Sequence, residues 1–133
     1  MIGVVDASAL IRLFIPDGPR PEGFEAFLRD VERGSNKAIA PELLVAEAAN
    51  VIVRKRKLGE LSENESMELL SDMLSVPIRL FPHKPILSRA FEMAWEFKLT
   101  VYDSLYLALA EENAAALYTA DERLVKVARR MNL

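Results

Sequence analysis

Two short apolar runs constrain the fold of this chain more than any other feature. They span residues 2–5 and 116–119, and each is followed closely by an aspartate, Asp6 or Asp121. Neither run alternates with polar residues, which is typical of a parallel strand that is buried on both faces. Amphipathic segments lie between them. Strands that alternate with helices predict a layered α/β domain around a mainly parallel sheet.

Apolar periodicity and turn residues predict the remaining elements. Pro41 is expected in the first turn of a long helix, and Ser62 opens a helix with a capping box. Leu87, Phe91 and Trp95 lie on the apolar side of another helix. The expected strands are 2–5, 37–40, 76–81 and 116–119, and the expected helices are 7–14, 24–34, 41–58, 62–74, 85–97, 100–113 and 122–131.

Composition excludes several kinds of site. A chain of 133 residues buries one core, so we predict a single domain over residues 1–133. Cysteine is absent, which excludes thiolate sites, and the single histidine, His83, is expected in a surface turn. The net charge of −3 means that nucleic acid would need a local basic patch. Because neither a basic leader nor a membrane-spanning run is found, we expect a soluble cytoplasmic protein.

Three aspartates lie where a parallel sheet places its ligand site. Asp6 and Asp121 follow strands, and Asp103 lies in the first turn of its helix. Ligands of open parallel sheets bind beyond the carboxyl ends of the strands, so these side chains can converge on one edge. Each also has a structural alternative. Asp6 and Asp121 stand where an aspartate caps a helix, and Thr100 with Asp103 forms a capping-box pattern.

Glu47 is the acid that a structural role explains least well. It lies within residues 43–49, a helical stretch that is apolar almost all round. A carboxylate in such a place is partly desolvated, which is costly unless a cation or hydrogen bonds compensate it. The alternative is that Glu47 reaches the surface or pairs with Arg54 on the same helix face.

An all-oxygen set of candidate ligands suits a hard cation. We expect Mg²⁺, with Mn²⁺ as the alternative, because carboxylate and water ligands favour these metals. One or two such ions activate water and stabilise the charge of an in-line phosphoryl displacement. The candidate catalytic and metal-binding residues are Asp6, Glu47, Asp103 and Asp121.

Four motifs, taken in order, resemble the PIN domain family. They are residues 4–8 (VVDAS), residues 41–47 (PELLVAE) followed by Asn50, residues 101–108 (VYDSLYLA) and residues 118–121 (YTAD). Length and motif order are similar to the VapC toxins of type II toxin–antitoxin pairs. The resemblance covers essentially the whole chain.

The resemblance implies a fold, an activity and partners. The fold is a three-layer sandwich with a mainly parallel central sheet and helices on both faces. The activity is endonucleolytic cleavage of RNA that depends on Mg²⁺ or Mn²⁺, and the partners are a cognate antitoxin and a second copy in a homodimer. Asp6, Glu47, Asp103 and Asp121 match the family's acids, with Ser8, Thr119 and Asn50 as supporting residues. Glu122 is an extra acid without an assigned role.

Basic residues give a weaker indication of the RNA path. Residues 54–57 (RKRK) are the only dense cationic run, and Arg54 and Lys55 are candidate RNA-binding residues. The alternative is that these cations complement the dipole at the helix C-terminus. A second stripe, which includes Arg123 and Lys126, is equally well explained as a solvated helix face.

Two other classes of function stay open on sequence alone. A phosphatase of the haloacid-dehalogenase kind also places an aspartate after its first strand, but its chemistry uses Asp-x-Asp, and here Ser8 holds the second place. A non-catalytic module that binds RNA or a protein is the other alternative. Saturable metal binding that is lost when Asp6 is replaced would exclude that module.

Overall fold

A four-stranded parallel sheet forms the centre of the molecule. The computed structural model describes residues 1–133 and gives the strand order β3-β2-β1-β4. Gly3 of β1 is in register with Ala38 of β2 and Ala116 of β4, all in parallel pairs. The mainly parallel sheet is therefore confirmed. The strands are β1 Ile2–Val5, β2 Lys37–Pro41, β3 Ile78–Phe81 and β4 Ala116–Tyr118.

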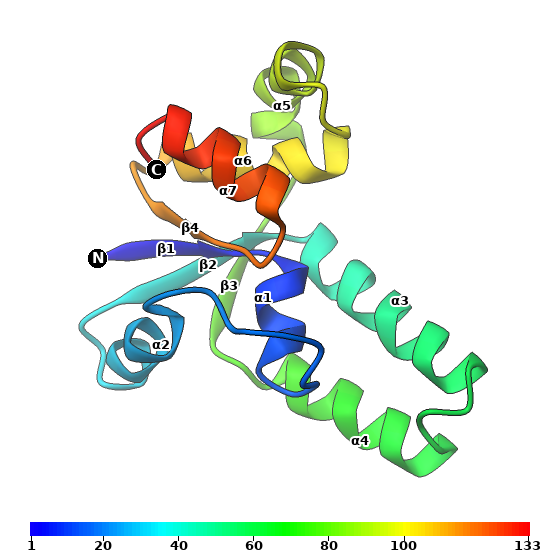
Figure 1. The fold of residues 1–133 in the computed structure, drawn as a ribbon. Coiled ribbons are helices and arrows are strands. Elements are labelled where there is room, and N and C mark those ends of the chain that lie inside the picture. Colours follow the sequence, from blue (N-terminus) through cyan, green and yellow to red (C-terminus); the bar gives the residue numbers. More distant parts are fainter.

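Helices cover both faces of this sheet. Figure 1 shows α5, α6 and α7 on one side, and α1 to α4 on the other. The expected three-layer arrangement is therefore confirmed. The helices are α1 Ala7–Arg12, α2 Phe24–Glu32, α3 Leu43–Lys57, α4 Glu63–Leu74, α5 Lys84–Phe97, α6 Val101–Glu112 and α7 Glu122–Arg130.

The connection from β2 to α3 differs from the sequence prediction. Pro41 is the last residue of β2, in register with Phe81 of β3, and the helix begins only at Leu43. His83 lies in the bend between β3 and α5, as expected, but its side chain is not fully exposed at the surface. It is partly buried, and its Nε2 accepts a hydrogen bond from the backbone N–H of Leu43 at 3.0 Å. The imidazole thus satisfies one of the free N–H groups at the start of α3.

Helix α6 is the central helix of its layer. Its residues from Ser104 to Ala110 are all buried, and it contacts β1, β2 and β4. Helix α5 packs against it with Ile86, Ala90 and Met93. The side of α5 that carries Trp95 was expected to be its apolar packing side, and this was wrong. The packing side is the one that Ile86 and Met93 occupy.

On the opposite face, α2 lies directly on the strands. The ring of Phe27 stacks on that of Tyr118 with centroids 4.7 Å apart, and both rings lie over Gly3. A Cβ atom at Gly3 would stand 2.6 Å from Phe27 Cζ and 2.7 Å from Tyr118 Cε2. Glycine in β1 therefore permits this close approach of helix and sheet.

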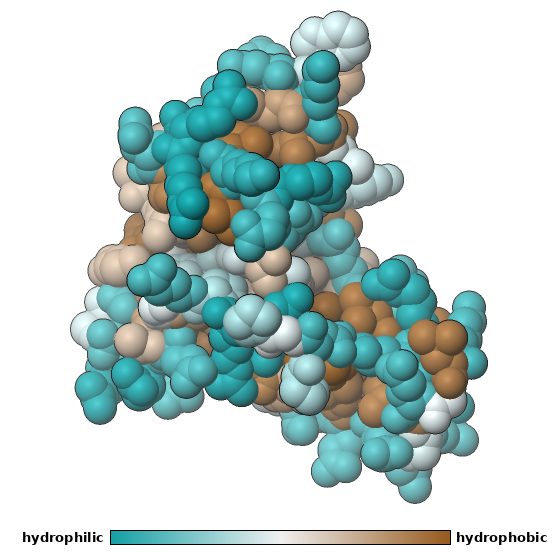
Figure 2. All heavy atoms as spheres, viewed as in Figure 1, coloured by the Kyte–Doolittle hydropathy of each residue, from teal (hydrophilic) through white to brown (hydrophobic).

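The α3–α4 hairpin extends away from the sheet (Figure 1). Ser62 opens α4 with the predicted capping box, since its side chain and that of Glu65 cap each other's backbone N–H groups. Figure 2 shows apolar atoms at the surface of this hairpin. Its exposed large apolar side chains are Val53, Leu58, Met67 and Leu74. No helix of the structure is both long enough and apolar enough to span a membrane.

Candidate active site

The strand order places a ligand site between β1 and β4. The chain leaves β1 toward β2 on one side, while β4 pairs on the other side, so β1 and β4 flank the switch point of the sheet. Open parallel sheets bind ligands at this point, beyond the carboxyl ends of the strands. Asp6 follows β1, and Thr119 and Asp121 follow β4.

Asp6 is held by hydrogen bonds on both carboxylate oxygens. Oδ1 accepts from the Ser8 hydroxyl at 2.7 Å and from the Ala9 backbone N–H at 3.0 Å, and Oδ2 accepts from the Thr119 hydroxyl at 2.5 Å. Asp6 thus caps α1, as the structural alternative proposed. A carboxylate has about four lone-pair sites. One site on Oδ2 is still free for another ligand.

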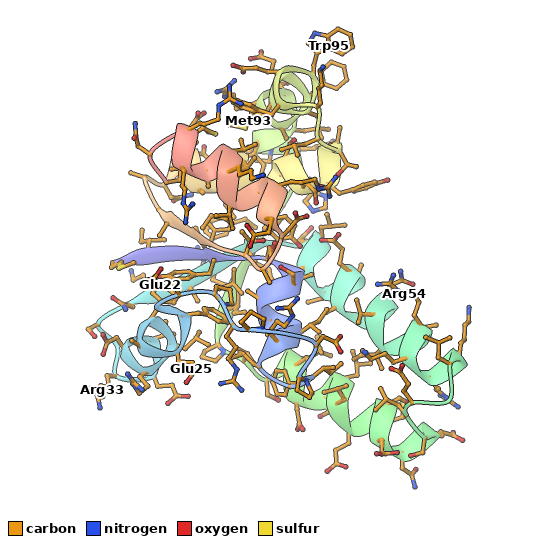
Figure 3. The ribbon with its side chains drawn as sticks, viewed as in Figure 1. Glu22, Glu25, Arg33, Arg54, Met93 and Trp95 are labelled. Carbon is orange, nitrogen blue, oxygen red and sulfur yellow. The ribbon has the colours of Figure 1, made fainter.

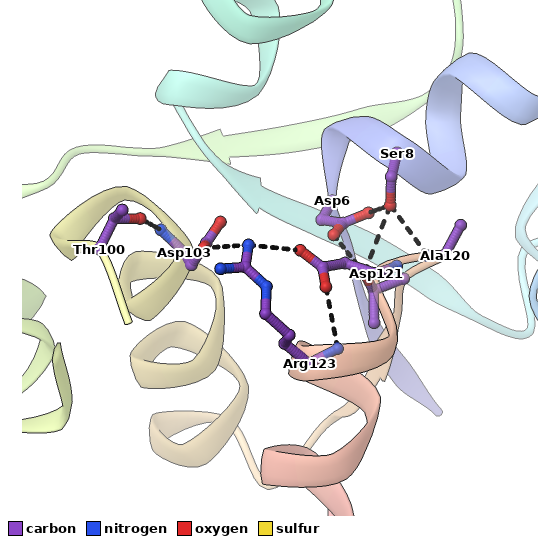
Figure 4. Close-up of polar contacts among 8 residues, drawn as sticks. Asp6, Ser8, Thr100, Asp103, Ala120, Asp121 and Arg123 are labelled. Atoms are coloured by element: carbon purple, nitrogen blue, oxygen red, sulfur yellow. Dashed lines mark hydrogen bonds and ion pairs between the residues drawn. The ribbon is translucent and has the colours of Figure 1, made fainter. Parts of the chain in front are cut away.

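Ser8 and Thr119 join the ends of β1 and β4. The Ser8 hydroxyl accepts from the Ala120 backbone N–H at 2.9 Å, and the Thr119 hydroxyl accepts from the Asp121 N–H at 3.0 Å. Because each hydroxyl also donates to Asp6, the loop after β4 and the carboxylate fix each other (Figure 4). The structure therefore brings two of the three predicted supporting residues, Ser8 and Thr119, onto Asp6.

The surroundings of Asp6 disfavour its charged form. Only 4% of its surface is exposed, and this burial raises its pKa from 3.8 to about 6. The hydrogen bonds from Thr119, Ser8 and Ala9 lower the pKa, but they do not offset burial, and the charge of Glu47 raises it further. Asp6 is thus a buried carboxylate that no nearby cation compensates.

Glu47 lies on α3 and faces α6. It is partly buried, and Tyr106 of α6 donates its hydroxyl to Glu47 Oε1 at 2.5 Å. Burial raises the pKa of Glu47, the Tyr106 bond lowers it, and the charge of Asp103 adds to the increase. Glu47 forms no ion pair with Arg54, so the predicted alternative of an ion pair on the same helix face was wrong. Arg54 lies on the exposed side of α3 (Figure 3).

Arg123 connects the two remaining acids. Its Nη2 lies 3.2 Å from Asp121 Oδ2 and 3.6 Å from Asp103 Oδ2 (Figure 4). Asp121 also caps α7, because its Oδ1 accepts from the Arg123 backbone N–H at 2.9 Å. Burial acts to raise the pKa of Asp121, but the hydrogen bonds from Arg123 outweigh it and lower that pKa. Asp121 is therefore a compensated carboxylate.

Only half of the capping box predicted at α6 forms. The Thr100 hydroxyl accepts from the Asp103 backbone N–H at 3.0 Å, but no bond returns from the Asp103 side chain to Thr100. The Asp103 carboxylate consequently plays no part in capping. It lies at the start of α6, one turn before Tyr106, and its charge acts on both Glu47 and Tyr106.

The other predicted residues lie outside this cluster. Asn50 is exposed and forms no side-chain hydrogen bond. The Lys55 ammonium is committed to Asp17 and Glu60, each at 3.1 Å. Sequence reasoning did not identify Tyr106 and Arg123 as parts of the site. Tyr106 lies in the quoted VYDSLYLA motif, where it looks like a core aromatic residue.

The acidic side chains of the site are suitable ligands for a divalent cation, but they do not lie close enough together to form a complete binding site. The free oxygen positions belong to Asp6, Glu47 and Asp103, all of them hard ligands that suit Mg²⁺ or Mn²⁺. Two of these carboxylates have raised pKa values, and a cation would relieve that strain. No three acidic or histidine side chains lie close enough together to hold an ion as they stand. Mg²⁺ keeps several waters, so one or two direct carboxylate ligands suffice.

The fold and this site define a class: open parallel α/β domains with an acidic cluster at the switch point of the sheet. The chain belongs to the PIN domain family, whose pattern matches residues 3–130. It is 30% identical to Ribonuclease VapC3 of Pyrobaculum aerophilum over 125 residues, which cover 92% of each chain. It is 32% identical to Ribonuclease VapC1 of Mycobacterium tuberculosis over 91% of this chain and 86% of that one.

Solved structures share the fold. The crystal structure of PAE2754 from Pyrobaculum aerophilum matches with a TM-score of 0.69 and 25% identity, over 93% of this chain and 82% of that one. VapC20 of Mycobacterium tuberculosis, described as a sarcin–ricin loop cleaving toxin, matches with a TM-score of 0.64 and 14% identity over 94% of both chains. The predicted family is therefore confirmed.

Proposed function

We propose that this protein is a metal-dependent endoribonuclease and the toxin of a toxin–antitoxin pair. The observation that carries the proposal is the buried, uncompensated Asp6 at the switch point, with Glu47 and Asp103 beside it. The relatives support it, since those that match over about 92% of the chain are named VapC ribonucleases. A buried carboxylate without a cation, in a chain whose relatives are named ribonucleases, favours catalysis over a module that only binds RNA.

Asp6, Glu47 and Asp103 would hold a divalent ion, which we expect to be Mg²⁺ or Mn²⁺. When bound, such an ion activates water and stabilises charge on the phosphate. Ser8 and Thr119 fix the Asp6 carboxylate so that its one free lone-pair site keeps a constant direction. The fixed geometry lowers the reorganisation needed during the reaction.

Glu47 is the residue best placed to accept a proton from the attacking water. Tyr106 donates to one oxygen only, so the other carboxylate oxygen stays free for this task. The phenol itself keeps its proton, because burial and the Glu47 charge raise the pKa of Tyr106 well above its usual range.

Two exposed apolar surfaces support the proposed partners. Leu87, Phe91 and Trp95 form a stripe on α5, and we assign it to a homodimer interface. The apolar surface of the α3–α4 hairpin continues from the helix that carries Glu47, so we assign it to the antitoxin. An inhibitor that binds there and extends along α3 toward Glu47 would cover the acidic cluster. We place the pair in the cytoplasm, where RNA and antitoxin are available.

Cleavage of a defined panel of tRNA and rRNA tests the activity. We expect cleavage with Mg²⁺ or Mn²⁺, none with EDTA, and a loss of at least about a hundredfold in Asp103→Asn. The matched control is Asp72→Asn, which removes an exposed carboxylate of α4 outside the site. Full cleavage in EDTA would contradict the metal mechanism. RNA binding without metal binding or cleavage would point to the non-catalytic module.

A further inference from the structure

The four acids of the site form two pairs with opposite electrostatic surroundings. No lysine or arginine forms an ion pair with Asp6 or Glu47. Asp103 and Asp121 share the guanidinium of Arg123, whose Nη2 lies 3.6 Å from Asp103 Oδ2 and 3.2 Å from Asp121 Oδ2. One side of the cluster lacks a cation, and the other side already contains one.

Arg123 contacts both carboxylate oxygens of Asp121. The backbone N–H of Arg123 is bound to Oδ1 at 2.9 Å, and Nη2 is bound to Oδ2 at 3.2 Å. A metal ion at Asp121 would have to bind beside the guanidinium, against the repulsion of its positive charge. Asp6 and Glu47 each keep a free oxygen position, and neither forms an ion pair with an arginine or lysine.

The rest of the guanidinium faces outward with unused donors. Nε and Nη1 of Arg123 form no hydrogen bond, and 68% of the side chain is exposed. Arginine presents five N–H donors in a planar fork that matches the oxygens of a phosphate. Arg123 therefore contacts two carboxylates with one nitrogen and presents its other donors to the solvent beside the cluster.

We propose that Arg123 is the second cation of this active site and takes the place that a second divalent ion would hold. A single divalent ion then binds on the Asp6–Glu47 side. The RNA phosphate meets that ion on one side and the Arg123 guanidinium on the other. This inference rests on the proposed ribonuclease function and adds a substrate-contacting residue to it.

A calorimetric titration of the whole chain with Mn²⁺ tests the proposal without measuring activity. We expect one ion per wild-type chain. Arg123→Gln should bind Mn²⁺ about tenfold more tightly or accept a second ion, because a unit charge beside two carboxylates is removed. Arg123→Lys should keep one ion, since it retains the charge. The control is Lys126→Gln, which removes an exposed charge of the same helix that forms no ion pair.

Cleavage kinetics then separate the phosphate contact from the charge effect. We expect Arg123→Gln to lower kcat by at least about tenfold although it binds the ion more tightly, with partial rescue by Arg123→Lys. Two Mn²⁺ ions on the wild type would overturn the proposal, as would equal Mn²⁺ binding by Arg123→Gln and Lys126→Gln. If the wild type cleaves no RNA, the proposed function fails, while the titration still decides which cation occupies the Asp103–Asp121 side.

Discussion

Asp6 and Asp121 both cap helices, yet their charges have different effects on stability. Asp6 is buried without a cation, so its pKa of about 6 exceeds the value of 3.8 in the unfolded chain. The folded state therefore binds the proton more tightly, and stability falls as the pH rises from about 4 to about 6. The pKa of Asp121 is lowered, so its charge stabilises the folded chain at neutral pH. Asp6 thus caps α1 even though burial makes its negative charge unfavourable in the folded state.

We predict that Asp6→Asn melts higher than the wild type at pH 8 without divalent ions. The difference in free energy of unfolding should be about 1 to 2 kcal/mol, below the roughly 3 kcal/mol that the two pKa values imply, because the amide accepts fewer hydrogen bonds. This difference in the free energy of unfolding should shrink as the pH falls through 6. Asp121→Asn should melt at or below the wild type. Thermal melts in EDTA at pH 4 to 8 measure both, and a lower Asp6→Asn midpoint at pH 8 would contradict the assignment.

Ser104 provides a second prediction at this scale. Its hydroxyl lies fully buried beside Asp103 and has no hydrogen-bond partner. An unpaired buried hydroxyl costs free energy, so Ser104→Ala should leave stability unchanged or raise it by about 1 kcal/mol. Ser8→Ala is the contrast, because it breaks bonds to Asp6 and Ala120 and should lower stability. Urea unfolding measures both variants, and a loss in Ser104→Ala larger than that in Ser8→Ala would show a partner for Ser104.

At the scale of elements, the sequence predicted those features that local patterns determine. Apolar runs marked β1 and β4, and the Ser62 capping box marked α4. Asp6 and Asp121 could be placed at one edge because parallel strands share their carboxyl ends. The bond between Tyr106 and Glu47 spans 59 residues and has no local pattern. The sequence left Arg123 open between a role in RNA binding and a solvated helix face, because helical periodicity does not show what lies beyond the helix start.

The sequence also could not predict which side of α5 packs against the rest of the protein. Both of its faces carry apolar residues, so periodicity alone favoured the face with the larger side chains. The structure buries Ile86 and Met93 against its neighbours, while 68% of Phe91 and 88% of Trp95 stay exposed. Which apolar face meets the core depends on the layer that the helix joins, and that is a tertiary property.

The close contact of α2 with β1 gives a prediction for this element pair. Gly3→Ala places a Cβ atom against the rings of Phe27 and Tyr118, and we expect a loss of about 2 kcal/mol in the free energy of unfolding. Phe27→Leu in the Gly3→Ala background should cost less than Phe27→Leu alone, because the smaller side chain relieves the clash. A double-mutant cycle by urea unfolding measures this coupling, and strictly additive losses would exclude the clash.

For the whole molecule, the folding of a single chain does not explain why two large apolar surfaces stay exposed. They lie on different elements, the α5 stripe and the α3–α4 hairpin, and Figure 3 shows Trp95 pointing away from the body of the protein. Aromatic and aliphatic side chains at such exposure are typical of interaction surfaces. Because the two surfaces are separate, the proposed homodimer could bind the proposed antitoxin without competition between the partners.

The dimer assignment is tested through Trp95, which is the only tryptophan of the chain. We predict a homodimer by light scattering, and a blue shift of tryptophan emission as the concentration rises, because association removes the indole from water. Trp95→Asp should give a monomer with an unchanged melting temperature at low concentration, since 88% of the side chain is exposed and packs on nothing that folding requires. Leu58→Asp on the α3–α4 hairpin is the matched control, which should remain dimeric.

A wild type that stays monomeric at every accessible concentration would contradict the assignment. Dimers that persist in Trp95→Asp but dissociate in Leu58→Asp would move the interface to the hairpin.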